Sequence, residues 1–210
     1  VLSAEQREQL CSSAVRLTEA LGYQGAGTLE YLYDDSTGEF FFIEMNTRIQ
    51  VEHPISELIT GIDLVQAMLR IAGGEPLGLR QSDIRLNGAA LQMRLNAEDP
   101  ARDFFPSPGK VEQLIWPQGA GVRVDSHLYP GYAVPPYYDS LLAKLIVHGR
   151  DRGEALARAR LAVEHTTLTG MASTLSLHRE LLAEPWLQQA DFHTGTLETW
   201  LAERRAGGVA

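Results

Sequence analysis

The segment from Thr28 to Met45 constrains the fold more than any other, because it has the pattern of a β-hairpin. Residues 28–34 favour a strand, Asp35-Ser36-Thr37-Gly38 has the composition of a turn, and residues 39–45 can return as a second strand. Three-residue loops often end at positive φ, which glycine adopts without strain, so we expect the loop to be residues 36–38. The sequence therefore predicts two antiparallel strands in a defined register.

In that register, Glu30 lies opposite Glu44 on one face of the hairpin. Phe42 is expected on the same face, with Leu32 opposite it, because side chains alternate between the two faces of a strand. The other face is apolar and is predicted to be the core face, carrying Leu29, Tyr31, Tyr33, Phe41, Ile43 and Met45.

The facing glutamates suggest a metal site. Two like charges opposite each other on a sheet repel, and more strongly where the local dielectric is low. A divalent cation between Glu30 and Glu44 removes that repulsion, and Mg²⁺ typically takes one or two carboxylates together with phosphate oxygens and water. The alternative is that both carboxylates are solvated on an open face, as surface carboxylates commonly are.

The chain that follows alternates polar and apolar residues. If it is extended, five polar side chains point the same way: Glu44, Asn46, Arg48, Gln50 and Glu52. A guanidinium fork matches the two oxygens of a carboxylate or bicarbonate, so Arg48 and Gln50 are suited to a small planar anion, and Glu52 to general-base work. The alternative is a half-exposed strand with a solvated polar face, which has the same pattern.

The second half of the chain differs in pattern from the first. Helices are expected at 3–21, 56–72 (one or two), 151–166, 174–184 and 196–205, and strands at 89–95, 111–116, 122–124 and 141–147. Gly73-Gly74-Glu75-Pro76 breaks the helical pattern, and we expect a domain boundary between there and Asn87, at 84/85. The predicted class is α+β, with antiparallel β-structure dominating the first 150 residues.

Composition limits the classes of partner. The 210 residues include 18 basic and 27 acidic side chains, and the net charge of −9 argues against general nucleic-acid binding. No stretch approaches the ~18 apolar residues of a membrane span, and no secretion signal is visible. The single cysteine, Cys11, fits a reducing, cytoplasmic setting. Because the chain begins at Val1, we expect a processed chain or a fragment.

Several runs of sequence strongly resemble the biotin carboxylase component of biotin-dependent carboxylases. They are GAGTLEYLYDDSTGEFFFIEMNTRIQVEHPISELITGIDLV, RLNAEDP, FPSPGKV, GVRVDSHLYPGYAVPPYYDSLLAKLIVHG and FHTGTLETWL. Other ATP-grasp ligases, such as carbamoyl-phosphate synthetase, share the two glutamates and the asparagine but lack QVEHP followed by RLNAEDP. The resemblance implies that residues 1–84 are the C-terminal half of an ATP-grasp domain and residues 85–210 the biotin carboxylase C-terminal domain.

The resemblance also implies a nucleotide and metal site. In this family ATP activates bicarbonate as carboxyphosphate, and the carboxyl group then passes to N1′ of biotin on a carrier domain. By resemblance, Glu30 and Glu44 hold Mg²⁺ (or Mn²⁺) against the ATP phosphates, Asn46 lies beside them as a further metal ligand, and Leu32 touches the adenine.

The remaining implied roles concern bicarbonate and biotin. Arg48, Gln50 and the backbone of Val51 would hold bicarbonate, and Glu52 resembles the base that deprotonates it. Arg94 resembles the cation that stabilises the enolate of biotin; without the motif, a surface salt bridge is the preferred interpretation of this arginine. Phosphoryl transfer depends mainly on positioning and charge neutralisation, which such residues supply.

This chain departs from the family pattern in several places. Ala89 and Gln92 stand where the family usually has a histidine and a glutamate, and Ser173-Thr174 stands where it usually has Thr-Asn, which affects a local contact and not the fold. The family enzyme is about twice as long, and its N-terminal half carries the Rossmann-like domain, the glycine-rich lid and the lysines that grip ATP. We therefore expect this chain alone to be inactive.

Two classes of function follow. The first is part of a biotin carboxylase, as in the acyl-CoA carboxylases of fatty acid metabolism or in pyruvate carboxylases. Its expected partners are a biotin carboxyl carrier, a carboxyltransferase and a second copy in a homodimer, without nucleic acid or membrane. The alternative is a non-catalytic folding, dimerisation or carrier-docking module derived from such an enzyme.

Overall fold

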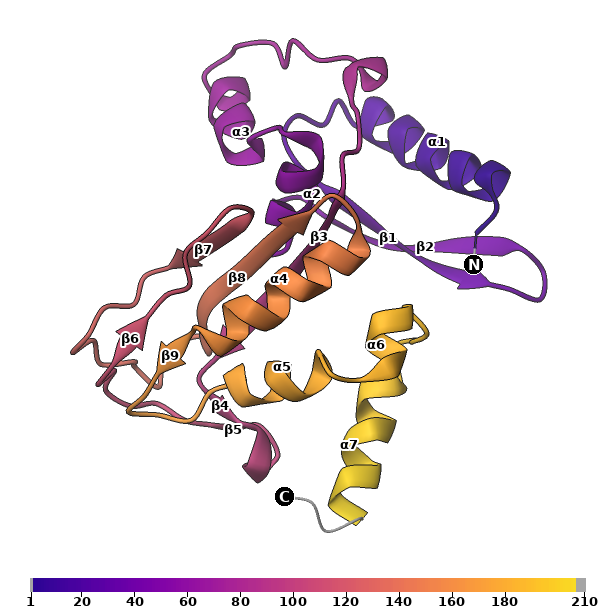
Figure 1. The fold of residues 1–210 in the computed structure, drawn as a ribbon. Coiled ribbons are helices and arrows are strands. Elements are labelled where there is room, and N and C mark those ends of the chain that lie inside the picture. The colour runs from indigo at the N-terminus through magenta and orange to yellow at the C-terminus, as the bar shows by residue number, and fades with distance from the viewer. Residues whose placement is uncertain (1, 207–210) are drawn as a thin grey trace. The chain divides into compact units, whose positions relative to one another are not determined.

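The computed structural model describes residues 2–206, and the chain divides into two compact units, Val1–Arg85 and Leu86–Ala210 (Figure 1). The division falls one residue after the boundary expected from the sequence. Helices and antiparallel strand pairs occur in both units, so the fold class is α+β, as predicted.

The first unit begins with helix α1 (Ala4–Ala20), which starts and ends close to the predicted positions. The Gln6 backbone nitrogen donates to Ser3 Oγ (3.1 Å), and the Ser3 nitrogen donates to Gln6 Oε1 (2.8 Å), so the helix begins with a capping box. Gln6 also donates through Nε2 to the Tyr33 hydroxyl (2.9 Å), and Ser13 shares a hydrogen bond with the Tyr31 hydroxyl (3.3 Å). Helix α1 therefore lies against the tyrosine face of the hairpin.

The hairpin of β1 (Thr28–Asp34) and β2 (Glu39–Asn46) has a longer loop than predicted. Asp34 pairs with Glu39, so the loop has four residues, and the register near the turn differs by one from the expected one. A bulge at Ile43 then restores the expected register, and Glu30 pairs with Glu44 as predicted.

The offset near the turn corrects two predictions about the faces of the hairpin. Phe42 pairs with Tyr31, with ring centroids 5.8 Å apart, and so shares the tyrosine face and not the glutamate face. Leu32 pairs with Phe41, which was expected on the core face but lies on the opposite one. Phe41 and Ile43 are 55% and 51% exposed, so neither is a core residue within this unit.

Two helices follow, α2 (His53–Thr60) and α3 (Leu64–Ala72). Gly61 ends α2 at positive φ (72°). The Leu64 nitrogen, at the start of α3, donates to the buried carboxylate of Glu57 (2.8 Å), which ties the two helices together. The remainder of the unit is irregular apart from a 3₁₀ turn, Gln81–Asp83.

The second unit is built on a three-stranded antiparallel sheet in the order β3-β8-β7. These strands are Ala89–Asn96, Leu141–Gly149 and Val122–Ser126. Helix α4 (Arg152–Glu164) covers one face of the sheet, and its N-cap, Asp151, accepts from the Glu154 nitrogen (2.8 Å). All three strands and α4 overlap the predicted elements.

Shorter elements complete this unit. They are β4 (Glu98–Asp99), a 3₁₀ turn (Pro100–Arg102), β5 (Phe105–Pro106), β6 (Leu114–Ile115), β9 (Thr167–Leu168), α5 (Leu175–Leu181), α6 (Pro185–Gln189) and α7 (Thr196–Ala206). The strand expected over 111–116 is paired only at Leu114 and Ile115, and α6 was not predicted.

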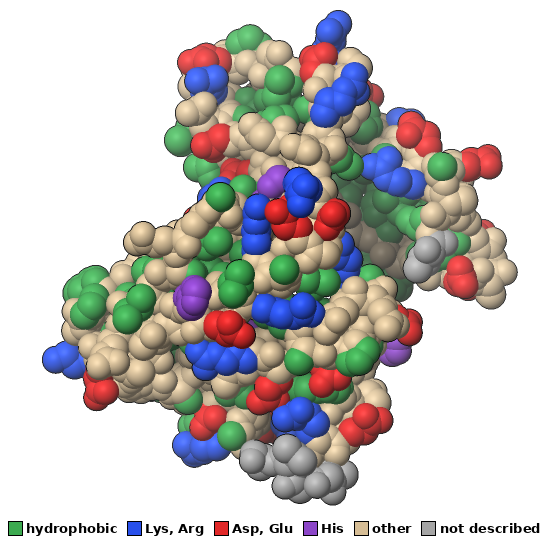
Figure 2. Space-filling model, in the orientation of Figure 1, with side chains coloured by type: hydrophobic (Ala, Val, Ile, Leu, Met, Phe, Trp, Pro, Cys, Tyr) green, Lys and Arg blue, Asp and Glu red, His purple; other side chains and the backbone are tan. Residues whose placement is uncertain are grey.

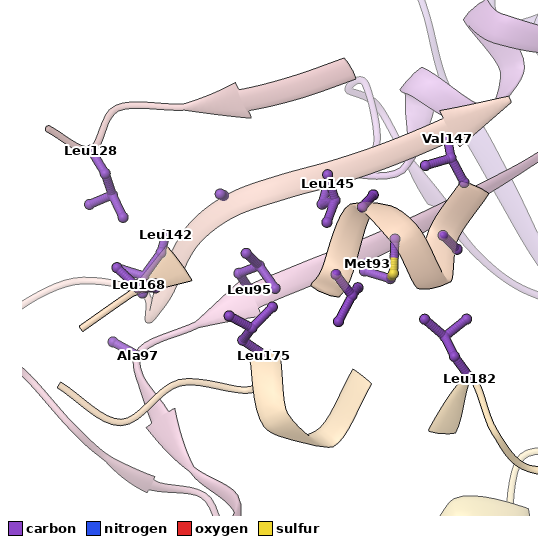
Figure 3. Close-up of a cluster of buried hydrophobic side chains, with 14 of the residues drawn as sticks. Met93, Leu95, Ala97, Leu128, Leu142, Leu145, Val147, Leu168, Leu175 and Leu182 are labelled. Atoms are coloured by element: carbon purple, nitrogen blue, oxygen red, sulfur yellow. The ribbon is translucent and has the colours of Figure 1, made fainter. Parts of the chain in front are cut away.

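The core of the second unit lies between the sheet and helices α4 and α5 (Figure 3). Met93 and Leu95 of β3 are buried there, and Leu95 points toward Leu175 of α5. Because side chains alternate along a strand, Gln92, Arg94 and Asn96 occupy the opposite face of β3. Burial of the core face thus determines which side of the sheet carries Arg94.

The surface of this unit mixes the two signs of charge. Basic and acidic side chains lie next to each other on the face in Figure 2, and on α4 Glu154 pairs with Arg150 (3.0 Å) and Arg158 (2.9 Å). Within residues 2–206, no helix is long and apolar enough to cross a membrane.

Candidate active site

The two paired glutamates converge on the side chain of Asn46 at the end of β2. Asn46 Nδ2 donates to Glu30 Oε1 at 2.9 Å and to Glu44 Oε1 at 3.1 Å. The two carboxylate oxygens therefore approach one common point, now taken by the amide nitrogen. The structure thus brings together all three residues that the sequence pattern and the resemblance assigned to a metal.

This donor set fits a hard divalent cation. Carboxylate and amide oxygens are the ligands that Mg²⁺ prefers, and the ion usually takes only one or two carboxylates from a protein. No group of three or more His, Cys, Asp and Glu side chains suited to a metal occurs among the described residues, so a cation here would draw its other ligands from phosphate or water. Asn46 Oδ1 is held by Arg48 Nη2 (3.1 Å), and a half-turn of the amide would present that oxygen to the ion.

Arg48 continues the polar row away from the glutamates. Its guanidinium donates to Asn46 on one side and to Gln50 Oε1 (2.8 Å) on the other, and also to the Ile49 carbonyl oxygen (3.3 Å). The hydrogen bonds form one chain from the two carboxylates to Gln50. The arginine is thereby held in place beside the predicted metal position.

The predicted extended row is wrong beyond Asn46, because β2 ends there and the chain turns. The His53 nitrogen donates to the Gln50 carbonyl oxygen (3.2 Å), and His53 Nδ1 lies 2.6 Å from the same oxygen. Glu52 occupies the N-cap position of α2, with φ −84° and ψ 7°. Pro54 at the start of α2 explains the turn, because proline favours the first turn of a helix.

The turn nevertheless gathers the predicted anion-binding residues around one pocket. A pocket of about 290 Å³ is lined by Arg48, Gln50 and Glu52, together with residues 26–28 at the start of β1 and residues of α2 and α3. Gly27 is part of its wall, and a Cβ there would lie 2.8 Å from Met45 Cε, so the Met45 side chain would have to move. Val51 is half-buried between Gln50 and Glu52. The start of α2 adds the partial positive charge of a helix N-terminus to this pocket.

Leu32 lies on the same face of β1 as Glu30, two residues further along the strand. Its side chain is 64% exposed, which is unusual for a leucine in a paired strand. The structure therefore leaves an apolar surface next to the two carboxylates, where the resemblance places the adenine of ATP.

Arg94 lies on the sheet of the second unit, paired across the strands with Lys144. Lys144 Nζ contacts Asp125 Oδ2 (3.2 Å), and Arg123 donates to the same carboxylate through Nε (2.8 Å). Burial raises the pKa of Asp125, but the hydrogen bonds and charges of Arg123 and Lys144 outweigh burial and hold that pKa below its ordinary value of 3.8. Arg94, Lys144, Asp125 and Arg123 therefore share one face of the sheet.

Sequence reasoning did not find the residues around Arg94. Lys144 and Asp125 come from strands that were predicted, but the order of the strands in the sheet was not. Once β3, β8 and β7 are neighbours, Arg94, Lys144 and Asp125 fall in one row across them. The missing signal was the strand pairing, which is a long-range property.

Two family models match the chain. The model of the biotin carboxylase C-terminal domain matches residues 92–199, and the ATP-binding domain of the carbamoyl-phosphate synthase L chain matches residues 1–80. The chain belongs to the biotin carboxylase family.

Named biotin carboxylases are similar along almost all of the chain. The biotin carboxylase of Pseudomonas aeruginosa is 48% identical over 206 residues, covering 98% of this chain and 44% of that protein. Biotin carboxylase 1 of Bacillus subtilis is 45% identical over 199 residues, covering 95% of this chain and 44% of that protein. This biotin carboxylase chain therefore spans less than half the length of the relatives it matches.

Solved structures agree with this assignment. The biotin carboxylase domain dimer of the Hydrogenobacter thermophilus 2-oxoglutarate carboxylase, in complex with MgADP, ADP and bicarbonate, is 44% identical with a TM-score of 0.89. The match covers 94% of this chain and 44% of that one. The fold of this biotin carboxylase chain is thus that of the corresponding part of a complete biotin carboxylase domain.

Proposed function

We propose that a full-length protein containing this chain is an ATP-dependent biotin carboxylase. It forms carboxyphosphate from bicarbonate and ATP and then transfers the carboxyl group to biotin on a carrier domain. The observation that carries the proposal is the convergence of Glu30 and Glu44 on one point that is continuous, through Asn46, with Arg48 and Gln50.

The proposed roles follow from this arrangement. Glu30, Glu44 and Asn46 hold Mg²⁺ or Mn²⁺, which neutralises charge on the ATP phosphates when bound, and Leu32 contacts the adenine. Arg48, already held by two neighbouring amides, needs little rearrangement to bind the oxygens of bicarbonate. Gln50 and the Val51 N–H complete the anion site.

Glu52 lines the same pocket as Arg48 and is proposed to take the proton of bicarbonate. The deprotonated oxygen attacks the γ-phosphorus of ATP, and ADP leaves. Arg94, on the sheet face that also carries Lys144 and Arg123, is proposed to stabilise the enolate oxygen that develops on biotin as N1′ takes the carboxyl group.

The proposal extends to partners and setting. The full-length enzyme is proposed to form a homodimer and to work with a biotin carboxyl carrier and a carboxyltransferase. The dimeric state of the related 2-oxoglutarate carboxylase domain supports the first of these. The exposed, single Cys11 supports a reducing, cytoplasmic compartment. The acceptor is proposed to be an acyl-CoA, as in fatty acid metabolism, or pyruvate.

Comparing the full-length protein with residues 1–210 tests this function. We expect the full-length protein to cleave ATP in a bicarbonate-dependent reaction and to carboxylate free biotin, and we expect residues 1–210 alone to do neither. A full-length protein without bicarbonate-dependent ATP cleavage would contradict the proposal. Carboxylation of biotin by residues 1–210 alone would contradict the expectation that the reaction also requires the N-terminal half.

A second candidate is a non-catalytic folding, dimerisation or carrier-docking module. It is favoured by the exposed apolar side chains of Leu32, Phe41 and Ile43 on the hairpin. Mixing residues 1–210 with a separately prepared N-terminal half distinguishes the two. Restored ATP turnover supports the enzyme part, whereas binding of the biotinylated carrier without turnover supports the module.

A further inference from the structure

The backbone of Arg94 is held from outside its sheet by two side chains, those of Thr174 at the N-cap of α5 and of His178 within that helix. Thr174 Oγ1 donates to the Arg94 carbonyl oxygen (3.0 Å), and His178 Nε2 lies 2.8 Å from the same oxygen. Because a carbonyl oxygen only accepts, His178 must carry its proton on Nε2. Arg94 thus has two donors on one backbone oxygen.

Thr174 also forms hydrogen bonds with the backbone of Asn96, two residues further along β3. The Asn96 nitrogen donates to Thr174 Oγ1 (3.0 Å), and the Thr174 nitrogen donates to the Asn96 carbonyl oxygen (3.1 Å). β3 is at the edge of its sheet, and alternate residues direct their backbone groups to the side that β8 leaves open. Thr174 and His178 therefore cover this open edge at Arg94 and Asn96.

The hydroxyl of Thr174 forms its hydrogen bonds with strand β3 and not with its own helix, α5. Thr174 is the N-cap residue of α5, where a threonine hydroxyl commonly accepts from the first turn, yet it makes no such bond here. The side chain is buried, with 6% of the residue exposed, so no water competes freely for these hydrogen bonds.

The contact lies where the strand is irregular. The register of β3 against β8 is regular at Arg94 and Leu95 and shifts between Leu95 and Asn96, where β8 carries one extra residue. At such an irregularity the ladder by itself leaves backbone groups unpaired, and the position of the preceding residue is less constrained. The hydrogen bonds from Thr174 and His178 add a constraint on the β3 backbone next to this shift.

We propose that Thr174 and His178 are positioning residues that fix Arg94 for transfer of the carboxyl group to biotin. This inference rests on the proposed function, because Arg94 acts on biotin only in that reaction. A displacement of about 1 Å at a reacting group can cost ~10²-fold in rate. We call the hydrogen bonds from Thr174 and His178 to the β3 backbone the clamp. Loss of the clamp should therefore reduce carboxyl transfer to biotin and leave the earlier cleavage of ATP largely intact.

The test replaces Thr174 in the full-length protein and measures two activities side by side. Thr174→Val keeps the shape of the side chain but removes the hydroxyl; we expect biotin carboxylation to fall ~10–100-fold while bicarbonate-dependent ATP cleavage changes less than about threefold. Thr174→Ser restores the hydroxyl and should restore coupling. His178→Gln, which keeps an N–H donor, should retain more coupling than His178→Leu.

Thr166 provides the matched control. Its hydroxyl is also buried in the second unit and donates to a backbone oxygen, that of Ala162 (2.7 Å), which belongs to α4 and not to β3. Thr166→Val should leave the ratio of the two activities unchanged. If Thr174→Val keeps normal coupling, or if Thr174→Val and Thr166→Val lower both activities equally, the positioning role is wrong.

A second readout does not depend on catalysis. Amide hydrogen exchange at Asn96 should speed up about tenfold in Thr174→Val, because the Asn96 N–H loses its acceptor, and should not change in Thr166→Val. An unchanged rate in Thr174→Val would overturn the clamp itself. A lack of carboxylation by the unsubstituted protein, with the expected exchange behaviour, would instead overturn the proposed function and with it the role of the clamp in biotin transfer.

Discussion

Glu30 and Glu44 are directly paired across β1 and β2, and one amide nitrogen, that of Asn46, donates to both carboxylates. This arrangement balances the repulsion of the two charges with a neutral donor in place of a cation. It also leaves two carboxylates poised to exchange that donor for a metal ion, since their oxygens already approach a single point.

The first prediction concerns this pair and Mg²⁺. Without nucleotide, Mg²⁺ should raise the midpoint of thermal unfolding of the full-length protein. A Mg²⁺ concentration of ~100 times Kd should add ~2.7 kcal/mol to the free energy of unfolding. Glu44→Gln should abolish most of this increase because it removes one of the two carboxylates. Differential scanning calorimetry over a Mg²⁺ series measures the effect.

Glu39→Gln is the control for the first prediction. Glu39 is also paired with an acidic residue, Asp34, at the other end of the hairpin, but no asparagine side chain bridges that pair. Its variant should keep the full response to Mg²⁺. An equal response in Glu44→Gln would show that the ion binds elsewhere.

The second prediction separates Glu52 from Arg94. In the full-length protein, Glu52→Gln should lower both bicarbonate-dependent ATP cleavage and carboxybiotin formation by ~10²–10⁴-fold, because loss of a general base stops the first step. Arg94→Met should lower carboxybiotin formation and leave part of the ATP cleavage. Steady-state assays of both products test this, and normal coupling in both variants would contradict the assigned roles.

The third prediction concerns the core beneath Arg94. Leu95 is 0% exposed, and Leu95→Ala should reduce the free energy of unfolding by ~2–5 kcal/mol, because it removes buried methyl groups and leaves a cavity. Leu86→Ala, at a position that is 71% exposed, should change it by less than about 0.5 kcal/mol. Urea unfolding followed by circular dichroism gives both values; similar losses would argue against the described core.

The fourth prediction concerns pH. Burial lowers the pKa of His178 below its ordinary value of 6.5, although the Arg94 carbonyl opposes the shift. The unfolded chain therefore binds more protons than the folded one just below pH 6.5, so the contribution of His178 to stability is complete above that pH and is lost as the pH falls.

Urea unfolding at about pH 7.5 and about pH 5.5 measures this contribution. The free energy of unfolding should fall on acidification by more in the unsubstituted protein than in His178→Gln, whose side chain does not titrate. Equal losses in both proteins would show that His178 is not protonated on unfolding in this range.

The hairpin illustrates what local sequence can predict. The strand pattern and the turn residues were sufficient for two antiparallel strands and for the pairing of Glu30 with Glu44. The loop length was wrong by one residue, and the pairing held only because the bulge at Ile43 compensates. Turn sequences of this composition fit more than one loop length, so the turn residues alone do not determine the register next to the turn.

The anion-binding row shows a different limit. Alternation from Glu44 to Glu52 grouped residues that do lie close together, but the extended geometry it predicted is wrong, since β2 ends at Asn46 and α2 begins at His53. The pocket gathers Arg48, Gln50 and Glu52 around a bend and not along a strand. Periodicity alone does not distinguish a short extended strand from a turn with the same spacing.

The sequence by itself determined the family, the hairpin with its two glutamates, and the main helices, because these depend on residues close together in the chain. Only the tertiary structure decided which residues surround Arg94. Lys144 lies beside it because β3 pairs with β8, and Asp125 follows in the same row on β7. Thr174 and His178 reach its carbonyl oxygen from α5, at the edge of β3 that β8 leaves open. Such contacts are decided by burial of the core face of β3 and by satisfaction of its edge backbone groups, both of which depend on the whole fold.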